Sequence, residues 1–365
     1  MARVTRVDVT PLSISLHEPF GIATGTQPSA ENALVRLELD DGSCGLGEAA
    51  PFPAVNGETQ AVALKALTEL RQHLVGFDAN RWRELGPLLA PYRTTSPTAC
   101  CAVESALLDA WARCHSLSLW HFFGGATAVL VSDITIPTGD LEHAAASASR
   151  AAQLGYRQLK IKVGQGALPL DIERVRAVVT AAPNCKLLLD GNAALSASNA
   201  IQLCQALVKL GAPLEAFEQP TPKADFEGLR AVAEATGLAV LADESAQTPT
   251  DVLRIAQLNR SLGSAVGVNI KITKSGLLPA LEMIAIARTA GLKLMIGGMV
   301  ESELCMSLSA CIAAGIGGFD YVDLDTPLFM ADSPFVGGFA RNANGRGPHL
   351  DVSVISSGHG VVKPA

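Results

Sequence analysis

The chain has 365 residues, of which 48% are hydrophobic and 17% charged, and its net charge at pH 7 is −7. This length predicts two domains, or one barrel with a smaller unit, and the composition supplies a large apolar core and excludes a disordered chain. The negative charge, without a long basic run, excludes a nucleic-acid-binding surface. No apolar segment reaches the roughly 18 residues of a membrane span, and the N-terminus lacks the apolar block of a signal peptide.

The eight cysteines show neither a Cys-x-x-Cys pair nor a spacing typical of zinc sites. Cys100 and Cys101 are adjacent in a helical pattern, where they resemble small core residues. We therefore expect reduced thiols in a cytoplasmic protein.

Residues 1 to about 125 predict an α+β unit. Strand-like stretches come first, with Asp40-Asp41-Gly42 as a hairpin turn, and two helical patterns follow. The strands are expected at Val4–Leu16 and Leu34–Leu39, and the helices at Glu58–Leu74 and, after a Ser96-Pro97 start, at Ala99–Cys114.

After residue 130 the chain repeats eight β-type runs, whose centres lie about 25 to 28 residues apart. Ala- and Leu-rich helical patterns separate them, and several end in a glycine. Alternating strands and helices at an even period favour a (β/α) barrel over an open doubly wound sheet. The expected strands are Asp133–Pro137, Gln158–Val163, Lys186–Asp190, Leu214–Glu218, Ala239–Asp243, Val266–Lys271, Lys293–Gly297 and Tyr321–Asp325.

The final residues break the barrel rhythm again. A Gly-rich segment, GGFARNANGRG, precedes a strand-like DVSVIS, and we expect this part to return to the N-terminal unit. The predicted division is therefore a capping domain over residues 1–125, a barrel over 126–330 and a returning segment over 331–365.

Charged side chains gather at the carboxyl ends of the expected strands, where barrel enzymes keep their reactive groups. Three successive strands end in Asp190, Glu218 and Asp243. Carboxylates converging at one rim repel one another unless a cation lies between them, and hard oxygen ligands suit Mg²⁺. The alternative, that acids at strand ends are merely solvated or cap the next helix, holds for one acid better than for three in a row.

Two lysines, Lys160 and Lys162, lie two apart in an apolar strand and so point to the same face. The expected metal and its carboxylates provide the countercharge that tolerates them. Burial lowers the pKa of a lysine, so that it can act as a base near neutrality. Lys271, at the end of the sixth strand, is expected across the barrel mouth from Lys162.

This set of residues resembles the enolase superfamily, in its muconate-lactonizing subgroup. The segments GLGEAAP (Gly45–Pro51) and AVESALLDAWARCHSLSLWHFFGG (Ala102–Gly125) are similar to the capping domain of that family and its junction with the barrel. The resemblance implies a modified (β/α)7β barrel of TIM type, completed by an α+β capping domain and the C-terminal tail.

The resemblance also implies a mechanism. One Mg²⁺ ion per subunit binds the substrate carboxylate, Lys162 and Lys271 act as acid and base on opposite faces of the α-carbon, and Lys160 neutralises the enolate oxygen. Members similar to mandelate racemase carry a histidine where this chain has Lys271. None of the seven histidines falls at the end of an expected barrel strand, which argues against that branch.

The eighth strand bears on the choice of reaction, because Asp323 and Asp325 share one face. Dipeptide epimerases of the family carry a similar Asp-x-Asp, which binds the substrate ammonium. We therefore expect epimerisation of the C-terminal residue of a dipeptide. N-acylamino acid racemase and succinylbenzoate synthase, which share the catalytic core, stay open as alternatives. A barrel that has lost catalysis and only binds a partner is opposed by the complete set of competent residues.

Specificity is expected from the capping loop Pro19–Asn32. Family members acting on Ala-Glu carry an arginine where this chain has Gly25, which disfavours Ala-Glu but leaves it as an alternative. An apolar lid predicts hydrophobic or aromatic dipeptides, and its expected residues are Phe20, Ile22, Phe52 and Val55. Thr135 and Met299 are expected to contact the substrate as well. Family members often associate through the barrel, so a homo-oligomer is expected, without a number of subunits.

Overall fold

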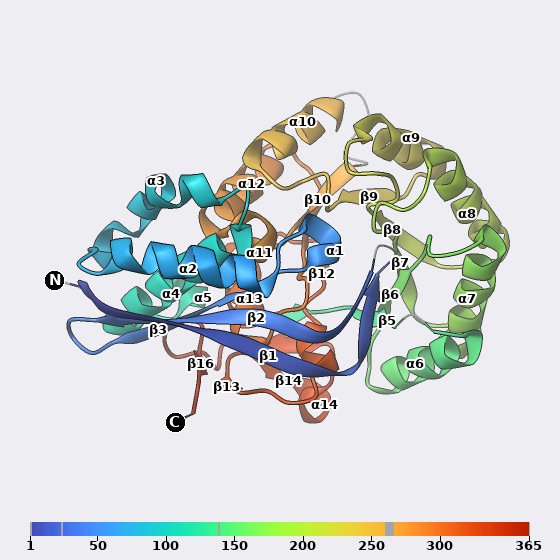
Figure 1. Ribbon diagram of the computed structural model, residues 1–365. Helices are drawn as coiled ribbons and strands as arrows, with labels where there is room; N and C mark the ends of the chain where they lie inside the picture. Colours follow the sequence, from blue (N-terminus) through green and yellow to red (C-terminus); the bar gives the residue numbers. More distant parts are fainter. Residues whose placement is uncertain (1, 23–24, 138, 260–265, 365) are drawn as a thin grey trace.

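The computed structural model describes residues 2–22, 25–137, 139–259 and 266–364. For residues 18–20, 22 and 25–26 it describes the backbone alone. A capping unit and a barrel lie side by side (Figure 1). No helix of the described chain has the length and apolar character needed to cross a membrane.

The capping unit is built on a three-stranded antiparallel sheet of β1 (Val4–Ile22), β2 (Gly25–Leu39) and β3 (Cys44–Ala49). The expected turn at Asp40–Gly42 joins β2 to β3, with Gly42 at a φ of 85°. Both first strands are longer than predicted, so the expected loop over residues 19–32 is the far end of a hairpin, in which Phe20 pairs with Gln27. The residue pattern of a single strand does not predict this extension, because it depends on pairing with the neighbouring strand.

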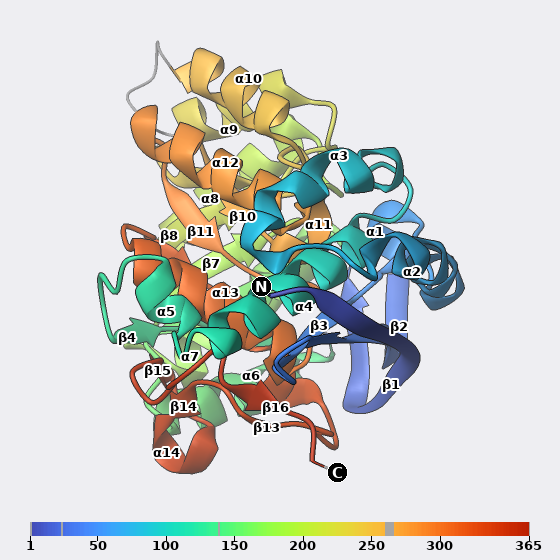
Figure 2. The same cartoon turned by 90° about the vertical axis from the view of Figure 1, so that its left-hand side faces the viewer.

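Two helices cover one face of this sheet, α2 (Gln60–Leu74) and α4 (Pro97–Cys114). Both were expected, and α2 begins two residues late because Thr59 caps it by accepting a hydrogen bond from the Val62 N–H. Gly45 and Gly47 bring β3 against α4: a Cβ at either position would overlap the α4 backbone at Ala106 or Ala102. Figure 2 shows α4 between the capping strands and the barrel helices.

The barrel sheet contains eight parallel strands in chain order, as predicted. They are β5 (Ile134–Ile136), β6 (Gln158–Lys162), β7 (Lys186–Asp190), β8 (Leu214–Glu218), β9 (Ala239–Ala242), β10 (Val266–Ile270), β11 (Leu294–Ile296) and β12 (Tyr321–Val322). The Asp133 N–H donates to the Val322 carbonyl at 2.8 Å, which joins the last strand to the first. Each predicted strand matches an observed one to within three residues at either end.

Helices follow the first seven strands and cover the outside of the sheet (Figure 1). They are α6 (Leu141–Gln153), α7 (Leu168–Ala181), α8 (Ala197–Lys209), α9 (Phe226–Thr236), α10 (Pro249–Asn259), α12 (Leu277–Thr289) and α13 (Glu303–Ile316). Shorter helices are α1 (Pro53–Asn56), η1 (Ala79–Glu84), α3 (Leu85–Leu89), η2 (Ala90–Tyr92), α5 (Leu119–Phe122), α11 (Ile272–Ser275), η3 (Thr326–Phe329) and α14 (Asn342–Gly345). The architecture is the expected (β/α)7β barrel with a capping domain.

The C-terminal residues form two small sheets. In one sheet, β15 (His349–Asp351) lies between β14 (Ala340–Arg341) and β4 (Val129–Val131) and pairs with both. In the other, β13 (Val336–Gly337) pairs with β16 (Val361–Val362). The predicted strand over 351–356 is therefore wrong beyond its first residue. The Asp351 carboxylate accepts hydrogen bonds from the backbone and hydroxyl of Ser353, and this local turn ends the strand.

The last turn of the chain returns to the capping unit as expected. The His359 N–H donates to the Asp109 carboxylate of α4 at 3.0 Å, and His359 Nε2 lies 3.1 Å from the Leu46 carbonyl of β3. Arg113 donates to the Val361 carbonyl at 2.8 Å. The tail thus closes the edge of the capping unit and fixes it against the barrel.

Candidate active site

The predicted lysine pair lies at the end of β6, and both side chains are buried. Lys160 Nζ lies among three carboxylates, 2.7 Å from Asp323 Oδ2, 2.8 Å from Glu218 Oε2 and 3.1 Å from Asp190 Oδ2. Lys162 Nζ lies 2.6 Å from Asp190 Oδ2. The two lysines therefore tolerate burial because carboxylates from three other strand ends surround them.

The predicted metal ligands occupy three neighbouring strand ends. Asp190 pairs in register with Glu218 across β7 and β8, and Asp243 follows the end of β9. All three side chains are buried, and each contacts at least one lysine. Burial raises the pKa of Asp190 and Asp243, but their lysine partners outweigh burial and hold both pKa values below the usual range.

Lys271 lies across the barrel mouth from Lys162, because β10 is four strands from β6 in the eight-stranded order. Its Nζ lies 2.7 Å from Asp243 Oδ2 and 3.6 Å from Glu218 Oε1. Burial lowers the pKa of Lys271, but Asp243 and Glu218 outweigh burial and raise it. Asp323 and Glu218 likewise outweigh burial and raise the pKa of Lys160. The expectation of lysine pKa values lowered by burial is therefore wrong for these two residues, since the carboxylates dominate.

Asp323 and Asp325 follow β12 and are both buried, with 5% and 1% of their surface exposed. Asp325 Oδ2 accepts a hydrogen bond from the Thr135 N–H at 2.6 Å. The two carboxylates and that of Asp133 lie within 4.8 Å of one another, the tightest carboxylate cluster found among the described residues. Burial and the charge of Asp323 raise the pKa of Asp325 to about 7.

Neighbouring side chains hold the predicted metal ligands in place. Gln219, at a φ of 32°, accepts hydrogen bonds from the backbone N–H groups of Asp243 and Ser245 at 2.9 and 3.0 Å. Asn269 donates to Glu218 at 2.9 Å, and Lys274 donates to Asp243 Oδ1 at 2.6 Å. A left-handed non-glycine residue next to a reactive carboxylate is a typical place for backbone strain at a functional site.

Apolar side chains close one side of the pocket between these groups. Its lining includes Phe52 and Val55 from the capping unit and Met299 after β11, together with Thr135. Phe52 and Met299 are buried, at 3% and 4% exposure. Four of the residues expected to line the substrate site therefore meet in one pocket. The side chains of Phe20 and Ile22, and the surroundings of Gly25, lie outside what the structure describes.

Two further acids near the pocket, Glu244 and Glu301, have raised pKa values. Burial, with the charge of Asp243 beside Glu244, raises the pKa of each carboxyl to about 8. Thr273 donates a hydrogen bond to Glu301. Glu48 of β3 accepts hydrogen bonds from the backbone and hydroxyl of Ser302 at 3.0 and 2.6 Å and so joins the capping sheet to the barrel.

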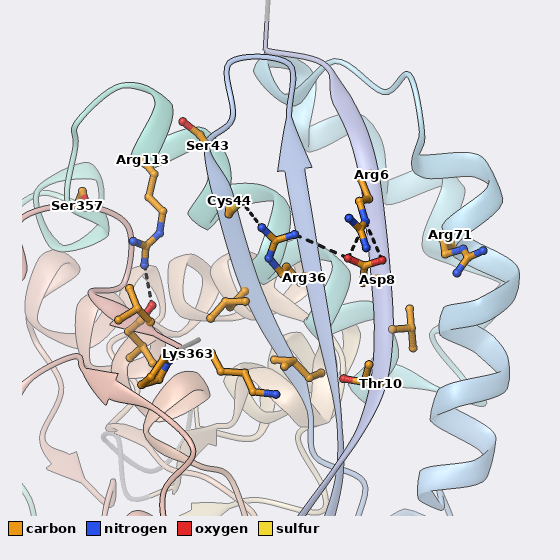
Figure 3. A pocket seen from close by; sticks show the side chains of 16 residues that line it. Arg6, Asp8, Thr10, Arg36, Ser43, Cys44, Arg71, Arg113, Ser357 and Lys363 are labelled. Carbon is orange, nitrogen blue, oxygen red and sulfur yellow. Dashed lines mark hydrogen bonds and ion pairs between the residues drawn. The ribbon is translucent and has the colours of Figure 1, made fainter.

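A second hollow of about 910 Å³ lies on the outer face of the capping sheet (Figure 3). Arg6 and Arg36 lie beside Asp8 there, and Arg113 points to the tail. None of the predicted catalytic or metal-binding residues lines this hollow. We therefore place the candidate active site at the barrel mouth.

Sequence reasoning missed Asp133, Gln219, Asn269 and Lys274. The Asp133 side chain lies near the acids that follow β12, although its residue precedes β5. Lys274 lies one helical turn after Lys271, and the spacing of three alone was a signal that both point to one side. The partners of Gln219 and Asn269 lie 24 and 51 residues away, and no local pattern reveals such contacts.

The chain matches two family descriptions. Residues 4–124 match the mandelate racemase/muconate lactonizing enzyme N-terminal domain, and residues 143–361 match the enolase C-terminal domain-like family. A relative from Herpetosiphon aurantiacus, named aromatic dipeptide epimerase, is 45% identical over 358 residues, which cover 98% of each chain. A relative from Citrifermentans bemidjiense, named hydrophobic dipeptide epimerase, is 33% identical over 92% of this chain and 94% of its own.

Among solved structures, the dipeptide epimerase from Enterococcus faecalis with Mg and the dipeptide L-Leu-L-Tyr superposes with a TM-score of 0.91. It is 30% identical, over 98% of this chain and 99% of its own. Together with the matched domains, these similarities carry the conclusion that this chain belongs to the mandelate racemase/muconate lactonizing enzyme family of the enolase superfamily.

Proposed function

We propose that the protein is an Mg²⁺-dependent dipeptide epimerase, which inverts the α-carbon of the C-terminal residue of a hydrophobic or aromatic L,L-dipeptide. One observation carries the proposal. The buried pair Asp323 and Asp325 lies at the same barrel mouth as two lysines on opposite sides, Lys162 and Lys271. The pair supplies a cation-binding end, and the lysines supply two faces for proton transfer.

The proton transfer uses the two lysines in turn. The neutral amine of one lysine takes the α-proton from one face, and the ammonium of the other delivers a proton to the opposite face. Between these two transfers, the electron pair of the broken C–H bond is delocalised into the substrate carboxylate. Lys160, held beneath the site by Asp323, Glu218 and Asp190, stabilises the negative charge that develops there.

The donor set fits Mg²⁺. Asp190, Glu218 and Asp243 are three buried carboxylates on neighbouring strand ends, and hard oxygen ligands are those that Mg²⁺ prefers. When bound there, the ion supplies Lewis-acid stabilisation of the substrate carboxylate and shares the carboxylate charge that now raises the lysine pKa values. Gln219 and Lys274 orient Asp243 for this task.

The dipeptide ammonium is held by Asp323 and Asp325. A diacid such as muconate would be repelled by this pair, and an N-acyl amino acid would leave it without a cation. The binding of a free ammonium therefore explains why two carboxylates are buried at the end of β12.

The substrate side chain meets Phe52, Val55 and Met299. Cations among the described residues that line the pocket are four lysines, each already paired with a carboxylate. No further charge faces a second substrate carboxylate, which disfavours Ala-Glu. The names of the relatives from Herpetosiphon aurantiacus and Citrifermentans bemidjiense point to the same substrate class.

The test compares L-Ala-L-Phe, L-Ala-L-Glu and N-acetyl-L-phenylalanine as substrates for the wild type and for Asp325→Asn. We expect the highest kcat/KM for L-Ala-L-Phe, and a loss of at least about tenfold in Asp325→Asn for dipeptides alone, since a hydrogen bond to a charged group is removed. A wild type that prefers the N-acetyl substrate, with no effect of Asp325→Asn, would favour an N-acylamino acid racemase instead.

We also propose a cytoplasmic location, supported by the eight cysteines, all of which are free thiols. The division at residues 125 and 330 and a homo-oligomeric state stay predictions. Light scattering on the purified protein measures the number of subunits, and limited proteolysis tests the boundaries.

A further inference from the structure

Asp133 is a buried carboxyl beside Asp323 and Asp325 to which the proposed proton transfer assigns no role. It directly precedes β5, and its side chain is fully buried. Its backbone N–H donates to the Val322 carbonyl and so joins β5 to β12. The position of the side chain is therefore fixed by the closure of the barrel.

The surroundings of Asp133 differ from those of its two acidic neighbours. Asp323 Oδ2 accepts from Lys160 at 2.7 Å, and Asp325 Oδ2 accepts from the Thr135 N–H at 2.6 Å. Neither oxygen of Asp133 has a hydrogen-bond donor among the described residues, and Asp323 Oδ1 is likewise buried without one. Unpaired carboxylate oxygens at this depth carry a large desolvation cost.

Charge repulsion also opposes the ionised form of all three carboxylates in this cluster. One oxygen from each of the three acids lies within 4.8 Å of the other two. Several other titratable groups act on this cluster. Lys160, Lys162 and Lys271 act on Asp323, Tyr156 acts on Asp133 and Asp325, and Arg341 from β14 acts on Asp325. Lys160 contacts Asp323 directly, but it also neutralises Glu218 and Asp190, so its charge is shared. Three ionised carboxylates beside this one shared ammonium repel one another, and one bound proton relieves the repulsion.

We propose that Asp133 is a protonated carboxyl that donates a hydrogen bond to Asp323 and so keeps Asp323 and Asp325 ionised and oriented toward the substrate ammonium. This role rests on the proposed function. One proton between an oxygen of Asp133 and Asp323 Oδ1 satisfies one unpaired oxygen on each side. It also leaves two negative charges, rather than three, to meet Lys160 and the ammonium. Asp133 is thus a positioning residue, which acts on the substrate through Asp323.

The titration behaviour of the cluster agrees with this assignment. Burial, followed by the charge of Asp323, raises the pKa of Asp133 well above its usual range. Burial raises the pKa of Asp323 too, but Lys160 outweighs burial and lowers it. The proton of the pair therefore belongs on Asp133.

The test compares Asp133→Asn, which keeps an N–H donor of the same shape, with Asp133→Ala, which has none. With L-Ala-L-Phe we expect the KM of the Ala variant to exceed that of the Asn variant by about tenfold or more, with a smaller change in kcat. The acidic limb of its kcat/KM profile should move to higher pH, because Asp323 loses a donor that favours its ionised form. The Asn variant should keep the limb near its wild-type position.

Two kinetic outcomes would overturn the proposal. If Asp133→Asn raises KM as much as Asp325→Asn does, Asp133 is an ionised third ligand of the ammonium. If the Ala and Asn variants share one KM and one pH profile, the side chain only fills space.

An infrared measurement keeps the test independent of turnover and of the folding of the Ala variant. The difference spectrum between the wild type and Asp133→Asn at pH 8 should show the carbonyl band of a protonated carboxyl in the wild type. Its absence would contradict the proposal even in an active enzyme. A wild type that shows this band but exchanges no dipeptide α-proton would overturn the proposed function instead.

Discussion

Lys162 and Lys271 face each other across the barrel mouth, and each is held by a carboxylate of a different strand, Asp190 or Asp243. Two bases on opposite sides of one carbon make a reaction reversible between epimers. This arrangement differs from a site with a single base, which would exchange the α-proton of one epimer alone.

We expect Lys162→Ala and Lys271→Ala each to lower the rate of epimerisation by about 10²- to 10⁴-fold, the usual contribution of a general acid or base. Each variant should still exchange the α-proton of one epimer for deuterium, because the lysine on one face remains. The epimer that still exchanges should differ between the two variants. NMR of L-Ala-L-Phe and L-Ala-D-Phe in D₂O measures both exchange rates.

Lys186→Ala, at the opposite end of β7, is the matched control, because Lys186 is exposed and pairs with Glu215. It should leave both rates unchanged. If both catalytic variants retained exchange into the same epimer, the assignment of the lysines to opposite faces would be wrong.

Two carboxylate clusters meet at the barrel mouth, and they differ in their partners. Asp190, Glu218 and Asp243 each contact Lys162 or Lys271, which are proposed to move protons. Asp323 contacts Lys160, which it shares with Asp190 and Glu218, and Asp325 accepts from a backbone N–H. The assignment of Mg²⁺ to the first cluster is therefore testable by binding alone.

We expect Glu218→Gln to weaken Mg²⁺ binding by more than about a hundredfold, since a direct ligand contributes more than the residues that orient it. Titration calorimetry measures the affinity, without turnover. Glu215→Gln, three residues earlier on β8, is the control and should bind Mg²⁺ normally, as should Asp323→Asn. Lost binding in Asp323→Asn with normal binding in Glu218→Gln would place the ion in the other cluster.

At the scale of elements, the strands of the barrel were predictable, whereas the full length of the first hairpin and the strand pairing of the tail were not. A buried parallel strand is an apolar run with a helix after it, so β5 to β12 could be identified from local pattern alone. The extension of β1 to Ile22 and the pairing of β15 with β4 depend on partners far along the chain. The residues proposed to be catalytic could be placed at the barrel mouth because they lie at or near strand ends, whereas the place of Asp133 depends on a neighbour 190 residues away.

The contact between the tail and α4 contains a histidine in one defined tautomer. The Val361 N–H donates to His359 Nδ1 at 3.1 Å, so Nε2 carries the proton that faces the Leu46 carbonyl and Asp109. Burial lowers the pKa of His359 below its ordinary value, and the nearby Asp109 only partly opposes this.

A lowered pKa means that the unfolded chain takes up a proton more readily than the folded one. The contribution of His359 to stability is therefore present above the unfolded pKa of about 6.5 and is lost as pH falls through it, by at most about 1.4 kcal/mol for each pH unit. In His359→Gln, the free energy of unfolding should fall less between pH 7 and pH 5 than in the wild type. Urea titrations at both pH values measure the free energy of unfolding. An equal fall between pH 7 and pH 5 in the wild type and in His359→Gln would contradict the assignment.

Over the whole molecule, the capping unit and the barrel form one site. Glu48 of β3 accepts from Ser302 at the start of α13, and Phe52 and Val55 reach the pocket between the barrel lysines. In the proposed function, the barrel supplies the groups for proton transfer and cation binding, and the capping unit adds apolar side chains to the pocket. The proposal therefore predicts that substitutions at Phe52 or Val55 change specificity more than the reaction.

The most direct measurement is the exchange of dipeptide α-protons in D₂O. The protein with Mg²⁺ is incubated with pooled L-Ala-L-Xaa and L-Xaa-L-Ala dipeptides, and mass shifts of one unit are followed, with a sample containing a chelator as control. The proposed function predicts shifts that need Mg²⁺ and are largest for dipeptides with apolar or aromatic C-terminal residues. Exchange strongest for Ala-Glu would contradict the specificity, and an absence of exchange in every dipeptide would contradict the reaction itself.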